Sequence, residues 1–549
     1  MQQIIQPDDS TQLAFKHYPI LSAFFREYKL FELFDRLLPK NRHYQVSHAQ
    51  CILLFLCDCL TARTPLSVYK SLLEDVDVEM IFGVGVRREY FNEYAMGETL
   101  DAIAKFGEDK LFTKVMEHLR QQVEIDMSHL HADTTNFSVA GEYNNGGVEP
   151  TGLHITRGHA KDKRTDLKRW ALMMIVNGMG IPVAMKALDG NSSDKNTIIE
   201  GMKALKEVLE SDGMTADASI FIADSSFYNK KNIASFKGKW ISHAQESLNE
   251  VKLYLAMEDL PFVDSQAKGY RTYGLESSYG EVDQRWVLVS SEQMYKRQKH
   301  TLIRRQEKQL KDANAEAYHL KATSFKCEPD ALAEAAKVVA HWPLLKALEP
   351  EVSTKMTNKP GQRGRPKAGE GIEVFSVSLT FEKDPLALAD ACKAIGKFML
   401  ATNDLSLSDE EVLQAYKQQQ TVERGFRFLK NGHLQLTPVY LKKPSRIQAL
   451  SFVMCFSLMV YAIIENQLRT SLAKANETIH IQDTGPADYR DNRRPTLMKV
   501  FALFKNLRTN VIDMPGGDQM LIRSSLPPEV KKVLHFLGKK YEQAFDRRI

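Results

Sequence analysis

The first part of the chain has the apolar spacing of helices. From about residue 11 to residue 125, apolar side chains recur at intervals of three and four, as at Phe24 and Tyr28, and this is the period of a helix with one buried face. Ser47 is a typical residue for the start of a helix. The pattern therefore predicts a helical N-terminal domain over residues 1–125.

From Leu130 onward the pattern changes to short strands rich in β-branched and aromatic residues. The predicted strands are His131–Val139, Trp170–Val176, Ile181–Leu188 and Ser219–Ala223. A helical stretch, Asn196–Leu209, separates the third strand from the fourth. Three strands, a helix and a further strand form the front half of a ribonuclease-H-like sheet, although other α/β folds share this order. The pattern predicts the fold class α/β.

The next segment, residues 245–395, has mixed character. It contains an alternating strand pattern at Arg285–Val289, a strongly basic helical stretch at Lys296–Lys311 and a loop rich in glycine and proline at Lys359–Lys367. The apolar run Lys397–Thr402 then resumes the strand pattern. We expect an inserted mixed α+β domain that interrupts the core.

These patterns divide the chain into five segments. They are the helical N-terminal domain, the first part of the core, the inserted domain, the second part of the core and a basic, helical C-terminal region. In that order, the expected bounds are 1–125, 126–244, 245–395, 396–475 and 476–549. Several domains are expected because 549 residues exceed what one hydrophobic core supports.

Composition and charge are those of an ordinary globular chain, with 43% hydrophobic and 26% charged residues. The formal net charge of +4 is weak evidence for a polyanionic partner, so local clusters matter more. The chain begins without an apolar signal region, and the run Ala449–Ile464 is expected to be a buried core helix and not a membrane span. Reduced thiols without zinc-site spacing are expected at Cys51, Cys57, Cys59, Cys327, Cys392 and Cys455.

A long helix with clear end signals follows the core strand. Ser408 and Glu411 form a capping box at its start, and Asn431-Gly432 provides a stop. The sequence predicts one continuous helix from about Asp409 to Lys430.

One face of this helix carries four polar side chains. At about 100° per residue, Tyr416, Gln419, Glu423 and Lys430 fall within a narrow stripe. A glutamate on a polar helix face is usually only solvated, so Glu423 gains a role only if other groups converge on it.

Two aspartates are candidates for that convergence. Asp133 lies in the first predicted strand and Asp224 closes the fourth, so the sheet can bring both to neighbouring positions with Glu423 beside them. Taken alone, each aspartate is better explained as a turn cap. Three converged carboxylates repel one another and therefore attract Mg²⁺ or Mn²⁺. Two ions about 3.5 to 4 Å apart can activate a water or a 3′ hydroxyl for in-line displacement.

The spacing of Tyr416, Gln419, Glu423 and Lys430 resembles the Tyr, Arg, Glu, Lys signature of bacterial insertion-sequence transposases with an Asp, Asp, Glu triad. The chain departs from the signature at Gln419, where the family has arginine, and a neutral amide supplies less charge to a DNA phosphate. Other segments that resemble the same group are 131–143, 161–168, 190–194 and 224–229.

This resemblance spans about residues 130–465 and implies a ribonuclease-H-like core interrupted before the glutamate. The interval from Asp224 to Glu423, 423 minus 224, is 199 residues and leaves room for the insert. The resemblance implies that Asp133, Asp224 and Glu423 are the catalytic residues and hold two Mg²⁺ or Mn²⁺ ions per site.

Basic and polar residues near this triad are expected to contact DNA phosphates, which set affinity and register without reading sequence. The expected DNA-binding residues are Tyr416, Gln419, Arg424, Arg427, Lys430, Lys163, Arg164, Lys168, Arg363 and Arg365. Further candidates are Lys161, Lys442, Lys443 and Arg446. For any one of these basic residues a solvated surface role is an equal alternative.

Two elements of the expected insert add positive charge. The stretch Lys296–Lys311 is the densest in the chain and is expected to contact DNA, although charge runs usually mark solvated faces. Arg363 and Arg365, followed by Pro366, resemble the core of an AT-hook that enters a narrow minor groove, with a flexible linker as the alternative. The N-terminal helical domain either binds DNA ends or serves only in packing.

We interpret the sequence as that of a DNA transposase. Such a protein binds the inverted ends of its own element, hydrolyses phosphodiester bonds and joins the freed 3′ hydroxyl to target DNA. The resemblance implies a homodimer in a paired-end complex, in the bacterial cytoplasm and with no membrane partner. Two alternatives are a metal-dependent nuclease without strand transfer and a catalytically silent DNA-binding protein.

Overall fold

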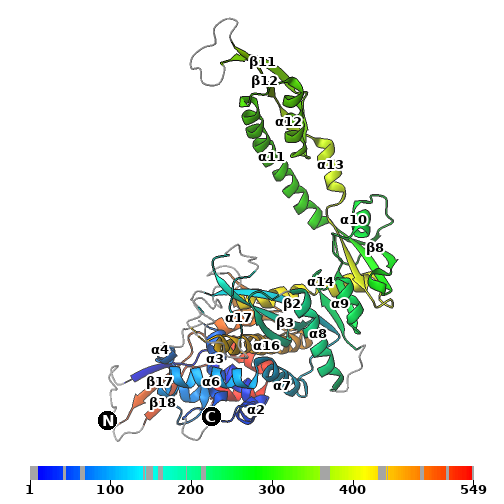
Figure 1. Ribbon diagram of the computed structural model, residues 1–549. Coiled ribbons are helices and arrows are strands. Elements are labelled where there is room, and N and C mark those ends of the chain that lie inside the picture. Colours follow the sequence, from blue (N-terminus) through cyan, green and yellow to red (C-terminus); the bar gives the residue numbers. More distant parts are fainter. Residues whose placement is uncertain are drawn as a thin grey trace. The chain divides into compact units, whose positions relative to one another are not determined.

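The computed structural model divides into two compact units (Figure 1). The first comprises residues 1–241 and 415–549, and the second is the continuous segment 242–414. The expected inserted domain, 245–395, falls within the second unit. The structure describes residues 10–40, 45–61, 69–139, 143, 153–158, 165–192, 194–211, 218–358, 371–430, 441, 443–482, 488–514 and 519–546.

The N-terminal part of the first unit is mainly helical, as the apolar spacing predicts. Its helices are α1 (Tyr18–Glu27), α2 (Leu30–Leu37), α3 (His48–Cys59), α4 (Tyr69–Leu72), α5 (Val78–Phe82), α6 (Glu93–Phe106) and α7 (Glu108–Arg120), with a 3-10 turn at Arg88–Tyr90. The prediction of a start at Ser47 is confirmed, because Ser47 and Gln50 form a complete capping box at α3.

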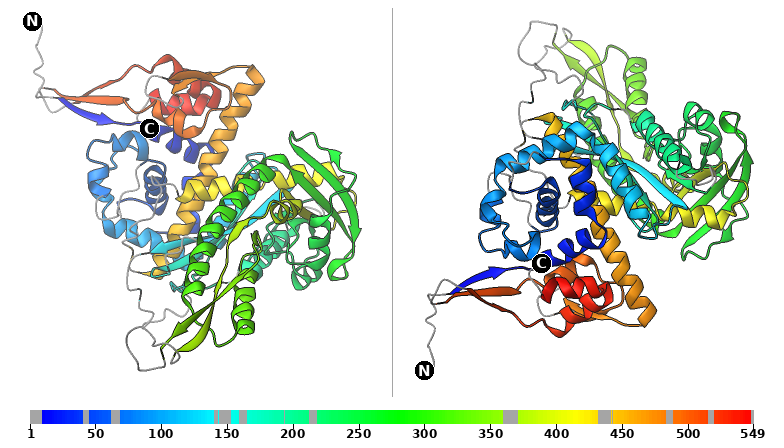
Figure 2. Two further views of the ribbon diagram at one scale, coloured as in Figure 1. Left: turned by 90° about the horizontal axis from the view of Figure 1, so that it is seen from above. Right: turned by 90° about the horizontal axis from the view of Figure 1, so that it is seen from below.

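One long helix, α16 (Pro444–Ala475), organises the first unit. It contacts α3, α6 and α7 from the N-terminal part and α18 (Pro528–Leu537) near the C-terminus. In Figure 2 it runs, in gold and orange, alongside both the blue N-terminal helices and the red C-terminal elements. By length and composition α16 is apolar enough to cross a membrane, but 89% of its apolar stretch is buried inside the protein. It therefore behaves as a core helix, as expected for Ala449–Ile464.

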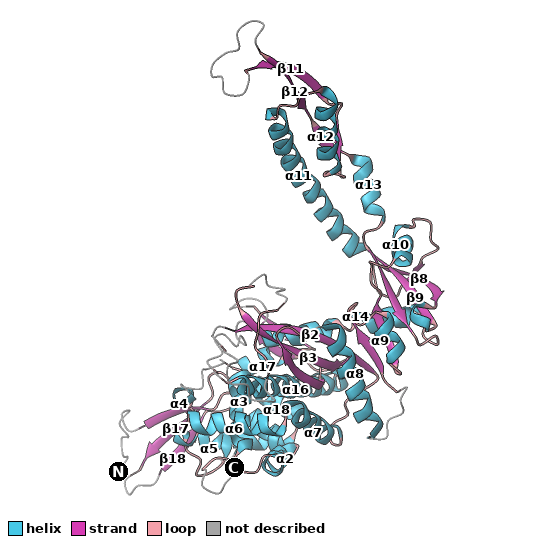
Figure 3. Ribbon diagram, viewed as in Figure 1, coloured by secondary structure: helices cyan, strands magenta, loops and turns pink. Residues whose placement is uncertain are grey.

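The mixed sheet of the first unit follows the predicted strand order. Its strands run β4-β3-β2-β5-β6, with β2, β3 and β4 antiparallel and β5 parallel to β2 (Figure 3). The bounds are β2 (His129–Val139), β3 (Lys168–Asn177), β4 (Pro182–Asp189), β5 (Ile220–Ala223) and β6 (Lys239–His243), of which β6 crosses the boundary between the units. The four strands predicted from the sequence are confirmed within a few residues, and β6 was not predicted.

Helices cover both faces of this sheet. Met173 and Met174 are neighbours in β3, so their side chains point to opposite faces. The backbone of Gly201 in α8 (Asp194–Ser211) lies against Met173, and that of Gly425 in α15 (Gln420–Lys430) lies against Met174. A short helix, α9 (Lys230–Ser235), precedes β6. The face under α15 is the one that carries Asp133, because Asp133 pairs with Met174.

Two sequence predictions for the chain ends are wrong in part. Residues 10–14 form strand β1 (Ser10–Ala14) and no helix, and β1 pairs with β17 near the C-terminus. The C-terminal region 476–549 is helical only in part. It contains β15 (Ile479–Gln482), β16 (Tyr489–Asn492), α17 (Leu497–Ala502), β17 (Arg508–Asp513), β18 (Gln519–Arg523), α18 and α19 (Lys539–Asp546). These strands depend on partners distant in sequence, which local periodicity does not show.

The second unit has strands in the order β14-β9-β8-β7, all antiparallel. Its elements are α10 (Asn249–Ala256), β7 (Val263–Asp264), β8 (Tyr270–Ser277), a 3-10 turn (Tyr279–Glu281), β9 (Gln284–Ser291), α11 (Glu292–Ala322), α12 (Glu328–Ala340), β10 (Leu345–Ala347), β11 (Glu351–Thr357), β12 (Ile372–Ser378), β13 (Phe381–Lys383), α13 (Pro385–Lys393), β14 (Lys397–Thr402) and the start of α14 (Asp409–Lys417). The unit contains both helices and strands, and the predicted bounds of β14 are confirmed.

Candidate active site

Two adjacent strands bring the aspartates to neighbouring positions. In the parallel register of β2 and β5, His131 pairs with Ile222 and Ala132 with Ala223. Continued by one residue, this register sets Asp133 beside Asp224, directly after β5 ends. Neighbouring strands lie about 4.8 Å apart, and paired residues point to the same face. The sheet therefore presents two half-buried carboxylates on the face that α15 covers.

Short hydrogen bonds from the chain fix both aspartates. The Thr134 N–H donates to Asp133 Oδ1 at 2.7 Å. The Ser226 N–H and hydroxyl both donate to Asp224 Oδ1, at 2.9 and 2.5 Å. Asp224 thus caps a turn, as its alternative reading expects, and the same turn holds its carboxylate in place. The role of Ser226 was not predicted, although a serine two residues after an aspartate is a recognisable turn signal.

Helix α15 supplies the third carboxylate. Its buried side chains are Val422, Phe426 and Leu429, whereas Glu423 in the first turn is exposed. The helix packs on β2, β3 and α16. A Cβ atom added at Gly425 would lie 3.1 Å from Leu458 Cδ2 and 3.2 Å from Met174 Cε. Glycine therefore permits the close approach that sets Glu423 over the aspartate face of the sheet.

The prediction of one continuous helix from Asp409 to Lys430 is wrong. The chain forms two helices, α14 and α15, separated by a turn at Gln418 and Gln419. The N–H groups of these two glutamines donate to carbonyls three residues back, at 3.2 and 2.9 Å, and not four residues back. The tighter turn interrupts the α-helical register, so Tyr416 and Glu423 belong to two successive helices and not to one.

The capping box at the start of α14 is confirmed, because Ser408 and Glu411 exchange hydrogen bonds as predicted. At the other end of the segment, the Gln418 side chain lies against Gly178, where an added Cβ would be 2.9 Å from Gln418 Oε1. Gly178 belongs to the turn between β3 and β4. This contact, which the sequence did not indicate, fixes the interruption between the two helices against the sheet.

Tyr416 is affected by all three predicted catalytic carboxylates, although a turn separates its helix, α14, from α15. Burial raises the pKa of the Tyr416 phenol well above its ordinary value, and the charges of Asp224, Glu423 and Asp133 raise this pKa further, in that order. A charge acts on a half-buried phenol in this way only over a short distance. The charges of the three predicted catalytic residues therefore all act on one tyrosine, which stays protonated and can donate a hydrogen bond.

His131 is a buried neighbour of the site that the sequence did not single out. It lies two residues before Asp133 on the same side of β2 and is fully buried. Within the described part of the chain neither ring nitrogen has a hydrogen-bond partner, and burial lowers the pKa of His131 to about 4. The ring is therefore neutral at ordinary pH and adds no charge beside the carboxylates.

The other predicted contact residues have mixed outcomes. Arg424 and Arg427 are exposed on α15, and Gln419 is half-buried in the turn before it. Lys168 Nζ donates to the Tyr143 carbonyl at 3.0 Å, which gives it a structural partner. Lys430 ends α15, with only its backbone described. The predicted residues that lie outside the described part of the chain are Lys161, Lys163, Arg164, Arg363, Arg365 and Lys442.

Arg446, which was expected to contact DNA, forms an ion pair within the protein. Its guanidinium binds both carboxylate oxygens of Asp101, at 2.8 and 2.7 Å, and lies against Gly97. This hydrogen bonding raises the pKa of Arg446 and lowers that of Asp101. Arg446 therefore joins α16 to α6, and the expectation that it contacts DNA has a structural alternative.

The donor set suits a hard divalent cation. Among the described residues, no three His, Cys, Asp or Glu side chains form a ready-made metal cluster. Two carboxylates nevertheless stand at adjacent register positions, and a third acts on the same phenol. Carboxylate oxygens are the ligands that Mg²⁺ and Mn²⁺ prefer, so Asp133, Asp224 and Glu423 fit this chemistry. The six cysteines are free thiols, as expected.

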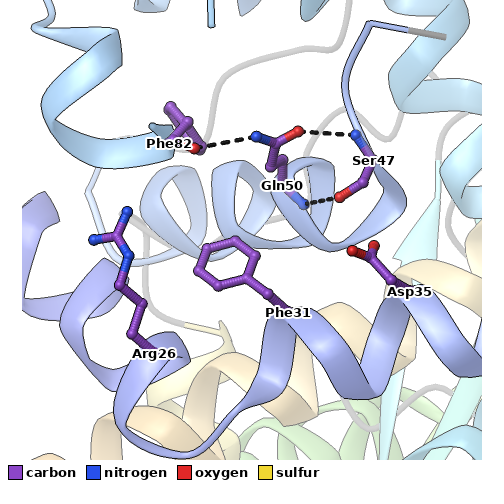
Figure 4. Close-up of a pocket in the computed structure, with 6 residues that line it drawn as sticks. All are labelled: Arg26, Phe31, Asp35, Ser47, Gln50 and Phe82. Carbon is purple, nitrogen blue, oxygen red and sulfur yellow. Dashed lines mark hydrogen bonds between the residues drawn. The ribbon is translucent and has the colours of Figure 1, made fainter. Parts of the chain in front are cut away.

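A polar pocket of about 350 Å³ lies in the N-terminal helices and contains none of these carboxylates. Figure 4 shows its lining residues, with the capping box of α3 on one side. They are Arg26, Phe31, Asp35, Ser47, Gln50 and Phe82. Gln50 bonds to Ser47 and to the Phe82 carbonyl, whereas Arg26 Nη1 has no hydrogen-bond partner among the described residues. Because its lining includes no residue of the predicted triad, the pocket is separate from the candidate active site.

Comparison with known families agrees with this geometry. Residues 10–117, which include the N-terminal helices, match a domain family of unknown function, DUF4277. Residues 124–460 match the transposase DDE domain, and this match includes all three carboxylates. No curated protein matches the chain in sequence. Enzymes of the transposase DDE family act on DNA and generally use divalent metal ions. Since the match covers more than half of its length, the chain belongs to the transposase DDE domain family.

Proposed function

We propose that Asp133, Asp224 and Glu423 are the catalytic triad of a DNA transposase with a ribonuclease-H-like core. In this function the protein binds the ends of its element, hydrolyses phosphodiester bonds and transfers the 3′ hydroxyl strand to target DNA. The observation that carries the proposal is the register of β2 and β5, which sets Asp133 beside Asp224 on the face of the sheet that α15, with Glu423, covers. The strand order of the first unit supports it.

The three carboxylates would hold two Mg²⁺ or Mn²⁺ ions, which when bound activate the attacking hydroxyl and stabilise the leaving oxygen. Ser226 and Thr134 hold the aspartates in their orientation before substrate arrives. Such preorganisation matters because phosphoryl transfer depends on positioning and on charge stabilisation. Tyr416 remains protonated beside the carboxylates and donates a hydrogen bond within the site.

The exposed Arg424 and Arg427 of α15 would contact DNA phosphates on the same side as Glu423. Gln419 replaces the arginine of the Tyr, Arg, Glu, Lys signature, so these two arginines supply the positive charge that it lacks. Lys168, Lys430, Lys163 and Arg164 are further candidates for phosphate contacts, and Arg363 and Arg365 for minor-groove contacts.

The family resemblance further implies a homodimer that joins two element ends, with residues 245–395 as the domain inserted before Glu423. We place this activity in the bacterial cytoplasm, with the protein bound to the nucleoid when it binds DNA. The helices of residues 1–125 are the part proposed to bind element ends, since they precede the catalytic domain in the chain.

The test is cleavage of a labelled duplex that carries the element end, in magnesium, with Asp224→Asn and Glu423→Gln. We expect both variants to bind the duplex and to lose cleavage. Glu200→Gln is the matched control, because Glu200 is exposed on α8, on the opposite face of the sheet. If both triad variants cut like the parent protein, the triad is wrong. Nicked products without joined products would indicate a nuclease, and binding without any cleavage would indicate a silent DNA-binding protein.

A further inference from the structure

The N-terminal half of α11 carries a row of cations on one face. Arg297, His300, Arg304, Lys308 and Lys311 are all exposed, and their spacing of three and four residues places them within an arc of about 80°. At about 1.5 Å per residue the row is about 21 Å long. We call these five residues the basic stripe.

The opposite side of α11 is committed to the core of the second unit. Gln306, Ala313, Ala317 and Leu320 are buried on that side. The last three belong to a hydrophobic cluster with α12, β10 and β12 (Figure 3). The helix therefore has a fixed orientation in its unit, with the basic stripe facing away from the core.

Acidic residues lie beside the stripe on α11, but among the described residues they form no ion pairs with its fixed cations. Within the described part of the chain, none of the four fixed cations, Arg297, Arg304, Lys308 and Lys311, forms an ion pair. The neighbouring Glu307 pairs instead with Lys383, at 3.2 Å. Like charges three and four residues apart destabilise an isolated helix, so the row does not serve the stability of α11.

Uncompensated cations in a straight row suit a regular polyanion. Each strand of duplex DNA has a phosphate about every 3.4 Å along the axis, so a stripe of about 21 Å faces about six phosphates. No Phe, Tyr or Trp lies between Arg297 and Lys311, which leaves no stacking platform for single-stranded bases. The apolar side of α11 is buried in its own unit, so the helix has no face to insert into a membrane.

We propose that the basic stripe binds the phosphate backbone of double-stranded DNA without preference for base sequence. This surface is separate from the carboxylates, and its binding requires neither metal ions nor cleavage. It gives the protein a hold on duplex DNA that adds affinity and not sequence recognition.

The test is the salt dependence of binding of the full-length protein to a fluorescent duplex of arbitrary sequence, measured by anisotropy in EDTA. The stripe variant combines Arg297→Gln, Arg304→Gln, Lys308→Gln and Lys311→Gln. Glutamine is a good helix former, and it removes the charge. With about 0.9 counterions released per phosphate contact, we expect the slope of log Kd against log salt to fall by about 3 to 4. Affinity at 0.1 M salt should fall more than about tenfold.

The matched control removes four exposed lysines elsewhere in the second unit and changes the net charge equally. It combines Lys252→Gln, Lys268→Gln, Lys346→Gln and Lys355→Gln. We expect this control to keep the parent slope. Equal slopes for the two quadruple variants overturn the proposal, as does a loss confined to single-stranded DNA or to anionic vesicles.

Two further variants test the stripe if the quadruple variant does not fold, and they separate the stripe from the proposed catalytic triad. Arg304→Gln alone should lower the slope by about 0.9, which tests the stripe if the quadruple variant does not fold. Asp224→Asn should keep the parent slope in EDTA. Failure of the proposed triad would appear as undiminished cleavage by Asp224→Asn, whereas failure of the stripe would appear as an unchanged slope.

Discussion

The carboxylate site of the first unit and the basic stripe of the second unit show two different ways of handling a polyanion. The carboxylates are half-buried or next to buried groups, and hydrogen bonds fix the two aspartates. The stripe is fully exposed, and no ion pair fixes its four cations within the described residues. A site that depends on geometry should fail when one atom changes, whereas a surface that depends on charge should weaken in proportion to the charges removed.

The largest expected effect is on DNA cleavage, and it follows from replacing one carboxylate oxygen of the predicted catalytic triad. Asp133→Asn removes a charge but keeps the size of the side chain, so cleavage should fall at least about a thousandfold, since ion ligation supplies several kcal/mol of transition-state stabilisation. Duplex affinity in EDTA should change by less than about threefold, because one internal carboxylate contributes little to backbone contacts. A small loss of cleavage, in proportion to the one charge removed, would remove the distinction between the two regions.

Buried histidines should lower the stability of the first unit in acid. Burial and the nearby Lys16 lower the pKa of His17 to about 3, so the unfolded chain takes up a proton below pH 6.5 while the folded chain does not. Stability is therefore lost as pH falls from 6.5 toward 3. His17→Phe keeps the ring stacked on Phe501 and should reduce the loss at pH 4.5 by roughly 2 to 3 kcal/mol.

Denaturant unfolding at pH 7.5 and pH 4.5 measures this effect. His48, whose pKa burial lowers to about 4, contributes in the same direction and stays in place as an internal reference. If His17→Phe and the parent protein lose the same stability between the two pH values, His17 titrates normally.

A smaller effect on cleavage is expected from disturbing the close packing of Gly425, which lies two residues after Glu423 in α15. Gly425→Val would press a branched side chain against Leu458 and Met174, and such overpacking typically costs about 1 to 3 kcal/mol. Because α15 must shift, cleavage should fall even at temperatures where the variant is folded. Gly425→Ala should be milder, since the gain in helix propensity partly offsets the contact. Full cleavage by folded Gly425→Val would show that Glu423 does not need this approach.

The smallest expected effect concerns Arg446, which has an ion-pair partner, whereas the fixed cations of the basic stripe have none among the described residues. Asp101→Asn removes the partly exposed carboxylate that Arg446 binds with two hydrogen bonds, and it should lower the unfolding free energy by about 1 kcal/mol. The salt slope of DNA binding should not rise, because Arg446 also packs against Gly97. A slope that increases by about one would show that Arg446 becomes a phosphate contact once Asp101 is neutral.

Local signals in the sequence predicted the elements that local forces determine. The capping boxes at Ser47 and Ser408, the four strands from β2 to β5 and the bounds of β14 follow from residues close in sequence. The positions of Asp133 and Asp224 could be predicted because each lies in or directly after such a strand.

The features that were missed depend on contacts between distant segments. The pairing of β1 with β17 joins residues about 500 positions apart, so no local pattern shows it. Around Gln418 and Gln419 the apolar residues keep the spacing of one continuous helix, so the sequence does not show the turn between α14 and α15. The contact of Gln418 with Gly178 appears only in the folded chain. Arg446 and Lys168 look like free surface cations in the sequence, but their partners are Asp101 and the Tyr143 carbonyl.

The most direct test of the catalytic account is a change of metal preference at Asp224. Asp224→Cys replaces a carboxylate by a thiolate, which binds Mg²⁺ poorly and softer ions better. The account predicts that this variant loses cleavage of the element end in magnesium and recovers part of it in manganese, whereas Glu200→Cys cuts equally in both. Undiminished cleavage by Asp224→Cys in magnesium would contradict the assignment of Asp224 as a metal ligand.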